Sequence, residues 1–250
     1  MRNPFKLLTL LPLLLLLLSF SDANKEPVGK ITFYVGRVFV IPTGTSELSL
    51  AQFNMDLTPG DKIETKKESR CEITLKTGDI VRVDANSLFT LEMVEASENS
   101  SKTESSIGVG KIWTNIKKIL SDDGYFKVKS PSAVIAVRGT IYRVDANEDT
   151  TTQVVVYDGE VAVSPHTAGM GWDGRAPQPG VQKPQQVAPP QEVGGPTEVS
   201  VEAWMQIVKA QQQIYVQPDG TYKVSDYDPE EDAKLDWVQW NKKRDRMIER

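Results

Sequence analysis

The residue types that most often carry out chemistry in proteins are scarce in this sequence of 250 residues. The single His (His166) and the single Cys (Cys71) exclude metal sites rich in either residue, a disulfide framework and any triad that needs a second His. The 34 Asp and Glu residues include no pair that stands out as acid and base, and no nucleophile motif accompanies them. We therefore predict a protein that is not an enzyme, with no catalytic residue, no metal and no cofactor.

The charge balance argues against nucleic acid as the partner. Lys and Arg total 29, so the formal net charge is −5, and no part of the chain forms a concentrated basic domain. Binding to phosphates requires clustered cations. The 39% of hydrophobic residues and 25% of charged residues are typical of a globular protein.

The N-terminus has the pattern of a secretory signal peptide. Arg2 and Lys6 form a cationic start, residues 7–18 are almost entirely apolar, and residues 21–23 place small side chains at a cleavage site. Twelve helical residues rise only ~18 Å, less than the ~30 Å hydrocarbon core of a membrane. We predict cleavage after residue 23 and a periplasmic or secreted protein. The alternative is an uncleaved signal that anchors the chain, which would be its only membrane contact.

The lone thiol lies in an alternating run. Residues 71–75 place Cys71, Ile73 and Leu75 on one face of a strand. Cys71 therefore reads as a small buried hydrophobe rather than a reactive nucleophile. An intermolecular disulfide is the alternative in an oxidising compartment.

From Val28 to about Val163 the apolar residues recur with a period of two. Short runs rich in β-branched and aromatic residues alternate with turns that contain Gly, Asp and Pro, such as residues 59–61 and 77–79. This spacing predicts an all-β fold, a β-sandwich or a short β-solenoid, over residues 24–166.

Two stretches interrupt this pattern. Residues 97–106 are polar and without periodicity, which predicts an exposed loop. In residues 107–120 the apolar positions are three and four apart, which favours a short helix over 111–120, with a strand through Trp113 as the alternative. In both cases we expect Trp113 to lie in the core.

Residues 164–199 are rich in Pro and Gly and carry a hexapeptide repeat of Pro and Val between 184 and 199. Such a composition predicts an extended linker, over 167–199. The alternative is an extended segment whose apolar edge lies along another surface.

The last part of the chain, residues 200–250, reads as a small helix–hairpin–helix extension. We predict helices over 201–211 and 229–248, joined by a hairpin with its turn at residues 217–220. So small a unit buries little surface alone. Its three Trp residues are therefore expected to pack against the β domain; they are Trp204, Trp237 and Trp240.

Two consecutive segments resemble the FecR domain: residues 130–144 (SPSAVIAVRGTIYRV) and residues 152–163 (TQVVVYDGEVAV). The similarity extends over about residues 28–163. The residues that carry it are Val137, Arg138, Gly139, Thr140, Asp158 and Gly159.

This resemblance implies a periplasmic, non-enzymatic all-β module. The founding FecR regulators relay a signal from an outer-membrane receptor to a cytoplasmic sigma-factor system. We find neither an N-terminal cytoplasmic anti-sigma segment nor a convincing transmembrane helix in this sequence. We therefore carry over the module, its location and a partner-binding role, but not transmembrane signalling.

The Arg of the motif also has a physical interpretation. Gly139 permits a bulge or a close backbone approach. Arg138 would then turn inward and pair with a turn carboxylate such as Asp61 or Asp79. We prefer this structural role to a role in ligand binding.

The function predicted from the sequence is a scaffold or signalling-associated module of the bacterial cell envelope that binds an envelope protein. The alternative is a module that binds cell-wall glycan. Four aromatic residues would supply its binding surface if they are exposed: Trp172, Trp204, Tyr222 and Trp237.

Overall fold

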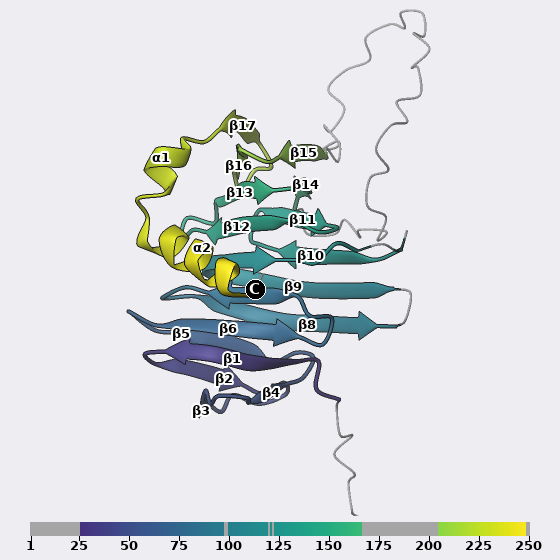
Figure 1. Ribbon diagram of the computed structural model, residues 1–250, viewed down its shortest axis with the longest axis vertical. Coiled ribbons are helices and arrows are strands. Elements are labelled where there is room, and N and C mark those ends of the chain that lie inside the picture. The colour runs from purple at the N-terminus through teal and green to yellow at the C-terminus, as the bar shows by residue number, and fades with distance from the viewer. Residues whose placement is uncertain (1–25, 98–99, 120, 122, 167–204, 249–250) are drawn as a thin grey trace, which may run out of the picture.

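The computed structural model describes residues 26–97, 100–119, 121, 123–166 and 205–248 (Figure 1). Their seventeen strands form one continuous, open sheet that folds into two layers. Every strand pairing is antiparallel except that of β9 with β10, so the sheet is mixed. The predicted all-β fold is confirmed.

The first layer contains nine strands. Their order across the layer is β4 (Asp56–Leu57), β1 (Gly29–Val35), β6 (Arg70–Leu75), β7 (Ile80–Val83), β9 (Ser101–Asn115), β12 (Ile141–Ala146), β13 (Thr152–Asp158), β16 (Gln212–Val216) and β17 (Tyr222–Asp226).

The second layer shares β9 with the first. Its order is β3 (Ser49–Leu50), β2 (Val38–Ile41), β5 (Lys62–Thr65), β8 (Leu88–Ala96), β9, β10 (Tyr125–Lys129), β11 (Ala133–Val137), β14 (Glu160–Pro165) and β15 (Gln206–Lys209).

The long strand β9 passes from one layer to the other at Gly110. Its residues 101–109 pair with β8 in the second layer, and its residues 110–115 pair with β12 in the first. Gly110 has a φ of 102°, and a Cβ at this position would collide with the side chain of Ser87. Only glycine adopts this positive φ and leaves room for Ser87 without strain.

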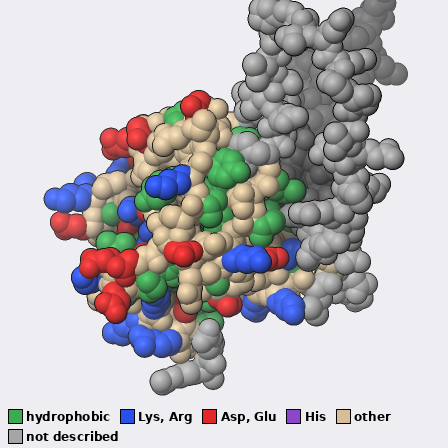
Figure 2. All heavy atoms as spheres, turned by 90° about the horizontal axis from the view of Figure 1, so that it is seen from above, with side chains coloured by type: hydrophobic (Ala, Val, Ile, Leu, Met, Phe, Trp, Pro, Cys, Tyr) green, Lys and Arg blue, Asp and Glu red, His purple; other side chains and the backbone are tan. Residues whose placement is uncertain are grey.

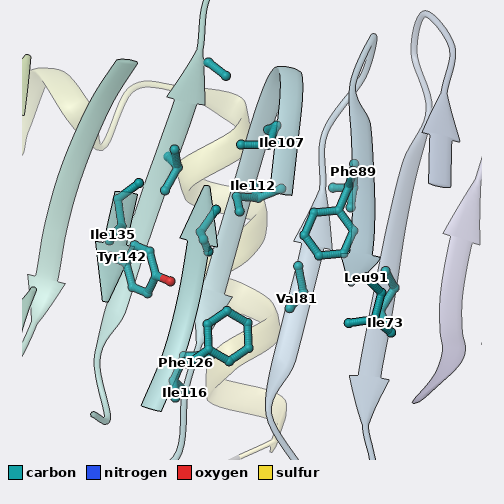
Figure 3. Packing of buried hydrophobic residues seen from close by; sticks show 14 of the residues in the cluster. Ile73, Val81, Phe89, Leu91, Ile107, Ile112, Ile116, Phe126, Ile135 and Tyr142 are labelled. Carbon is teal, nitrogen blue, oxygen red and sulfur yellow. The ribbon is translucent and has the colours of Figure 1, made fainter. Parts of the chain in front are cut away.

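One hydrophobic cluster fills the space between the layers, with side chains from strands of both (Figure 3). Ile73 and Ile112 come from the first layer, and Phe89 and Phe126 come from the second. Cys71 belongs to this cluster and is fully buried, as its alternating run predicts. Burial raises the pKa of its thiol to about 12, so the thiol stays protonated near neutral pH.

The predicted helix over 111–120 and most of the predicted loop over 97–106 are wrong, whereas the alternative, a strand through Trp113 with this residue buried, is confirmed. Residues 101–115 form β9, so there is no helix over 111–115, and the polar loop ends before residue 101. Both faces of β9 are covered beyond Gly110, because Ile112 enters the core between the layers while Trp113 joins a second cluster outside them. Because both faces of this part of β9 are buried, apolar residues occur at consecutive positions, and their spacing resembles that of an amphipathic helix.

The C-terminal region differs from the predicted helix–hairpin–helix in its first element. Residues 206–209 form strand β15, where Val208 pairs with Val161 at the edge of the second layer. The hairpin is confirmed as β16 and β17. The last helix is divided into α1 (Pro229–Asp232), capped by the side chain of Asp228, and α2 (Asp236–Ile248). The predicted linker, with its repeat, and Trp204 lie outside the described residues.

Candidate functional site

The outer face of the first layer carries a row of large and charged side chains. The strand register places Phe33, Glu72, Arg82, Trp113 and Arg143 opposite one another on five neighbouring strands. Such directly paired residues have Cβ atoms about 5 Å apart. Helix α2 crosses this face of the sheet in Figure 1.

Buried ion pairs attach α2 to this row. Arg82 is fully buried; it donates from Nε to Oε2 of Glu72 at 2.7 Å and from Nη1 to Oδ1 of Asp245 at 2.7 Å. Arg244 donates to both carboxylate oxygens of Glu72 at 2.8 Å. Burial alone would raise the pKa of Glu72, but the hydrogen bonds from Arg244 and Arg82 outweigh it and hold the pKa below its ordinary value.

Asp245 joins the helix to β9 as well as to β7. Its Oδ2 accepts a hydrogen bond from Nε1 of Trp113 at 3.0 Å, and its Oδ1 accepts one from Nδ2 of Asn115 at 3.1 Å. With Arg82 included, three donors satisfy this carboxylate. It is therefore a structural group, with no oxygen left over for acid–base chemistry.

A second buried group attaches α1. Nη1 of Arg143 donates to Oδ1 of Asp232 at 2.8 Å and to the hydroxyl of Tyr157 at 2.9 Å. Asp145, on the same strand as Arg143, is its second ionic partner, at 3.1 Å. Burial and the neighbouring Asp232 raise the pKa of Tyr157, so its hydroxyl remains protonated.

Aromatic contacts complete the covered face. Trp237, only 6% exposed, stacks on Trp240 with ring centroids 5.4 Å apart. The guanidinium of Arg70 lies 5.2 Å from the Trp237 ring and 5.1 Å from the Trp240 ring, within cation–π range. Trp237 and Trp240 therefore pack against the β domain, as predicted, although Trp240 is only half-buried.

A pocket of about 630 Å³ opens where α2 meets β12 and β13. Its floor contains Ile141 and the stacked pair of Trp113 and Tyr157, whose ring centroids are 4.3 Å apart. One wall is cationic and comes from a single stretch of α2: Lys242, Lys243 and Arg246.

The FecR-like motif residues meet at two adjoining turns. Gly139 (φ 106°) and Gly159 (φ 78°) belong to the turns after β11 and β13, and a Cβ on Gly159 would lie 2.9 Å from the carbonyl oxygen of Gly139. Thr140 is buried and donates to the carbonyl of Glu160 at 2.9 Å, linking the two turns. Val137 is buried at the end of β11. Asp158 is exposed and lines the pocket.

The predicted partners of Arg138 are engaged elsewhere. The carboxylate of Asp61 accepts hydrogen bonds from the backbone of Thr43 and Thr58, at 2.9 and 2.7 Å. The carboxylate of Asp79 accepts them from the backbone of Lys117 and the hydroxyl of Thr77. These donors, and not Arg138, are the partners that the structure gives the two carboxylates. Arg138 itself is half-buried.

The predicted aromatic binding surface is not assembled by the residues that the structure describes. Tyr222 is 43% exposed on β17, at the end of the sheet that Figure 2 views, whereas Trp237 is buried on the face of α2 that packs against the sheet. Trp172 and Trp204 lie outside the described residues. The pocket was not predicted, because a run of basic residues near a helix C-terminus is already accounted for by the helix dipole and no local pattern relates it to Ile141 and Tyr157.

Within the described ranges, no group of three or more His, Cys, Asp and Glu residues is placed to hold a metal ion. Neither described helix has the length and apolar character needed to cross a membrane.

Comparison with solved structures finds two crystal structures described as a "putative anti-sigma factor" from Parabacteroides distasonis ATCC 8503. Each is 18% identical to this chain with a TM-score of 0.44, and the match covers 67% of this chain and 60% of that one. No curated protein matches. A family model described as FecR protein matches residues 61–162. These residues of the chain are a FecR domain.

Proposed function

We propose that this chain is a non-enzymatic, exported FecR-domain module that binds another protein of the bacterial cell envelope, as a scaffold or as a signalling component. The observation that carries the proposal is the pocket beside α2, whose cationic wall stands out on a chain of net charge −5. Complementary charge between partners gives specificity and speeds association.

An enzymatic role fits this pocket poorly. Its two carboxylates are Asp158 and Asp245, and Asp245 is held by three donors. Neither His nor Cys nor Ser is among the residues that line it. A hydrolytic or transfer reaction needs a nucleophile and a base within hydrogen-bonding reach of each other.

Glycan binding is the second candidate, and the aromatic rings beside the pocket argue against it. Sugar rings pack on open aromatic faces, but Trp113 is only 1% exposed and stacks on one face of Tyr157. Nζ of Lys242 lies over the Tyr157 ring, 5.2 Å from its centroid. Tyr222 is the exposed aromatic residue left from the predicted surface, and it stands on β17.

The location in the envelope rests on the N-terminal pattern of residues 1–23. N-terminal sequencing of the protein from the envelope fraction should give Asn24 as the first residue. A chain that begins at Met1 would contradict cleavage and favour an anchored form.

The test of the proposal is affinity capture from the native envelope with a charge-reversed variant. Tagged wild-type protein should enrich a specific protein after mild cross-linking, and Lys243→Glu/Arg246→Glu should lose it. The matched control is Lys209→Glu/Lys223→Glu, which makes the same charge change at two exposed positions on β15 and β17. Enrichment of wall polymer would support the glycan candidate instead, and equal capture by both variants would place the binding surface away from the pocket.

A further inference from the structure

We propose that the pocket beside α2 binds a short acidic segment of a partner protein, with carboxylates on Lys242, Lys243 and Arg246 and an aliphatic side chain against Ile141. The inference rests on the proposed function and deepens it by naming the chemistry of the partner.

The basic residues of α2 divide into two sets. Arg244 turns toward the sheet, where it donates to Glu72 and lies 4.2 Å from the ring centroid of Phe33. Lys242, Lys243 and Arg246 instead line the pocket. Among the residues that the structure describes, none of these three forms an ion pair, and Lys243 and Arg246 are exposed. Lys243 and Arg246 are therefore available to a ligand, and Lys242, whose Nζ lies over the Tyr157 ring, keeps hydrogen-bond donors for a carboxylate.

The negative groups of the pocket do not neutralise this wall. The carboxylate of Asp245 is already shared among Arg82, Trp113 and Asn115. Asp158 is the other carboxylate that lines the pocket. Three cations thus face one available anion. Two of the cations, Lys242 and Arg246, are four residues apart, a spacing at which like charges destabilise a helix. An anionic ligand would relieve that repulsion.

The floor selects an aliphatic rather than a ring-shaped group. One face of the Tyr157 ring is covered by Trp113, Lys242 lies over the ring, and Tyr227 forms a T-shaped contact with it at a centroid distance of 5.7 Å. A sugar or a nucleobase would find no open aromatic face there. Ile141 and Ala233 supply the aliphatic lining. The volume of about 630 Å³ lies within the usual range of ligand sites, roughly 300–1,000 Å³, and holds a few side chains.

Acidic peptides of defined pattern test the inference on the mature full chain. Titration calorimetry at low salt would compare acetylated tetrapeptide amides of three kinds: alternating Glu and Leu, Glu alone, and alternating Lys and Leu. We expect the Glu–Leu peptide to bind most tightly and the Lys–Leu peptide not to bind. Lys243→Glu/Arg246→Glu should weaken the Glu–Leu complex at least about tenfold, and Lys209→Glu/Lys223→Glu should not. Raising the salt to about 0.5 M should weaken it too, since exposed charges are screened.

Several outcomes would overturn the inference. Equal binding of the Glu-only peptide would reduce the pocket to a charged surface without an apolar site. Preference for oligogalacturonate would assign it to anionic glycans. Peptide binding that is unchanged in the charge-reversed variant would place the site elsewhere. If no peptide binds while envelope capture still depends on Lys243 and Arg246, the acidic-segment inference fails and the proposed function stands. Unchanged melting midpoints would show that each variant is folded.

Discussion

The space between the two layers and the outer face beneath α2 are both buried, but they are built from different residues. Between the layers lie Val, Ile, Leu and Phe side chains in one continuous cluster. Between α2 and the sheet lie Glu72, Arg82 and Trp113 from the strands, together with Trp237 and Asp245 from α2 itself. The cluster between the layers is stabilised by the apolar area that it removes from water. The stability of the cluster beneath α2 depends on the geometry of its ion pairs, because each buried charge needs its partners.

This difference implies different tolerance to substitution. A core of apolar residues accepts changes that keep its volume, usually at a cost of less than about 1.5 kcal/mol. A buried ion pair does not tolerate the substitution of either residue, because the removal of one partner leaves the other charged and desolvated. Variants on the two sides of one sheet can therefore measure which kind of burial holds the C-terminal helices in place.

The largest effect is expected at Arg82. Arg82→Ala leaves the carboxylates of Glu72 and Asp245 without their shared partner, and loss of one member of a buried pair costs about 3–5 kcal/mol. Urea unfolding should show this loss in the free energy of unfolding. Adding Asp245→Asn to this variant should restore part of the lost free energy of unfolding, since the second substitution removes one uncompensated charge. A cost below about 1 kcal/mol would mean that water reaches the pair and that the face beneath α2 is not a second core.

Two neighbours on β9 give a more direct comparison. Trp113→Phe removes the donor to Asp245, and an unsatisfied buried acceptor costs about 1–3 kcal/mol. Ile112→Val removes one methylene between the layers and costs about 0.5–1.5 kcal/mol. Hydrogen exchange should show α2 loosened by the first change and not by the second. Equal loosening of α2 by both would show that the two clusters behave as one unit.

The local sequence pattern predicts which residues lie between the layers far better than it predicts which residues lie beneath α2. Alternation of apolar residues marks an inward face by itself, so Cys71 and Ile73 were assigned correctly. Glu72 alternates with Cys71 and Ile73, and Arg82 alternates with Val81 and Val83, so the local pattern places both on the face opposite the core. Asp245 follows Arg82 by 163 residues, a separation at which no local pattern connects them.

The errors in secondary structure have the same origin. Residues 206–209 lie within the predicted helix over 201–211, but they form β15 because the edge of β14 offers unpaired backbone groups. Thr103 and Ser105 occupy inward positions on β9 as small polar residues, and the hydroxyl of Ser105 donates to the carbonyl of Lys127 at 3.1 Å. Tertiary pairing overrode local propensity in both places.

Acid should affect the face beneath α2 through Glu72. Its pKa in the folded protein lies below the ordinary value, so ionised Glu72 stabilises the fold above the ordinary pKa, and this contribution is lost as the pH falls through the folded pKa. Glu72→Gln should therefore flatten the dependence of the free energy of unfolding on pH in the acid range, relative to wild type. Urea unfolding between about pH 3 and pH 6 measures it. Parallel curves for the two proteins would exclude Glu72 as a contributor.

The smallest effect is expected for an exposed pair on the same part of the chain. Glu231 and Lys234, joined by an ion pair, each have a side chain that is 67% exposed, whereas Asp232 pairs with Arg143 in the interior. Exposed pairs of this spacing contribute only about 0.3–0.5 kcal/mol. Lys234→Ala should thus leave the urea midpoint nearly unchanged, while Asp232→Asn should lower it. If Lys234→Ala were as costly as Asp232→Asn, total charge near α1, and not the burial of particular pairs, would hold the C-terminal helices to the sheet.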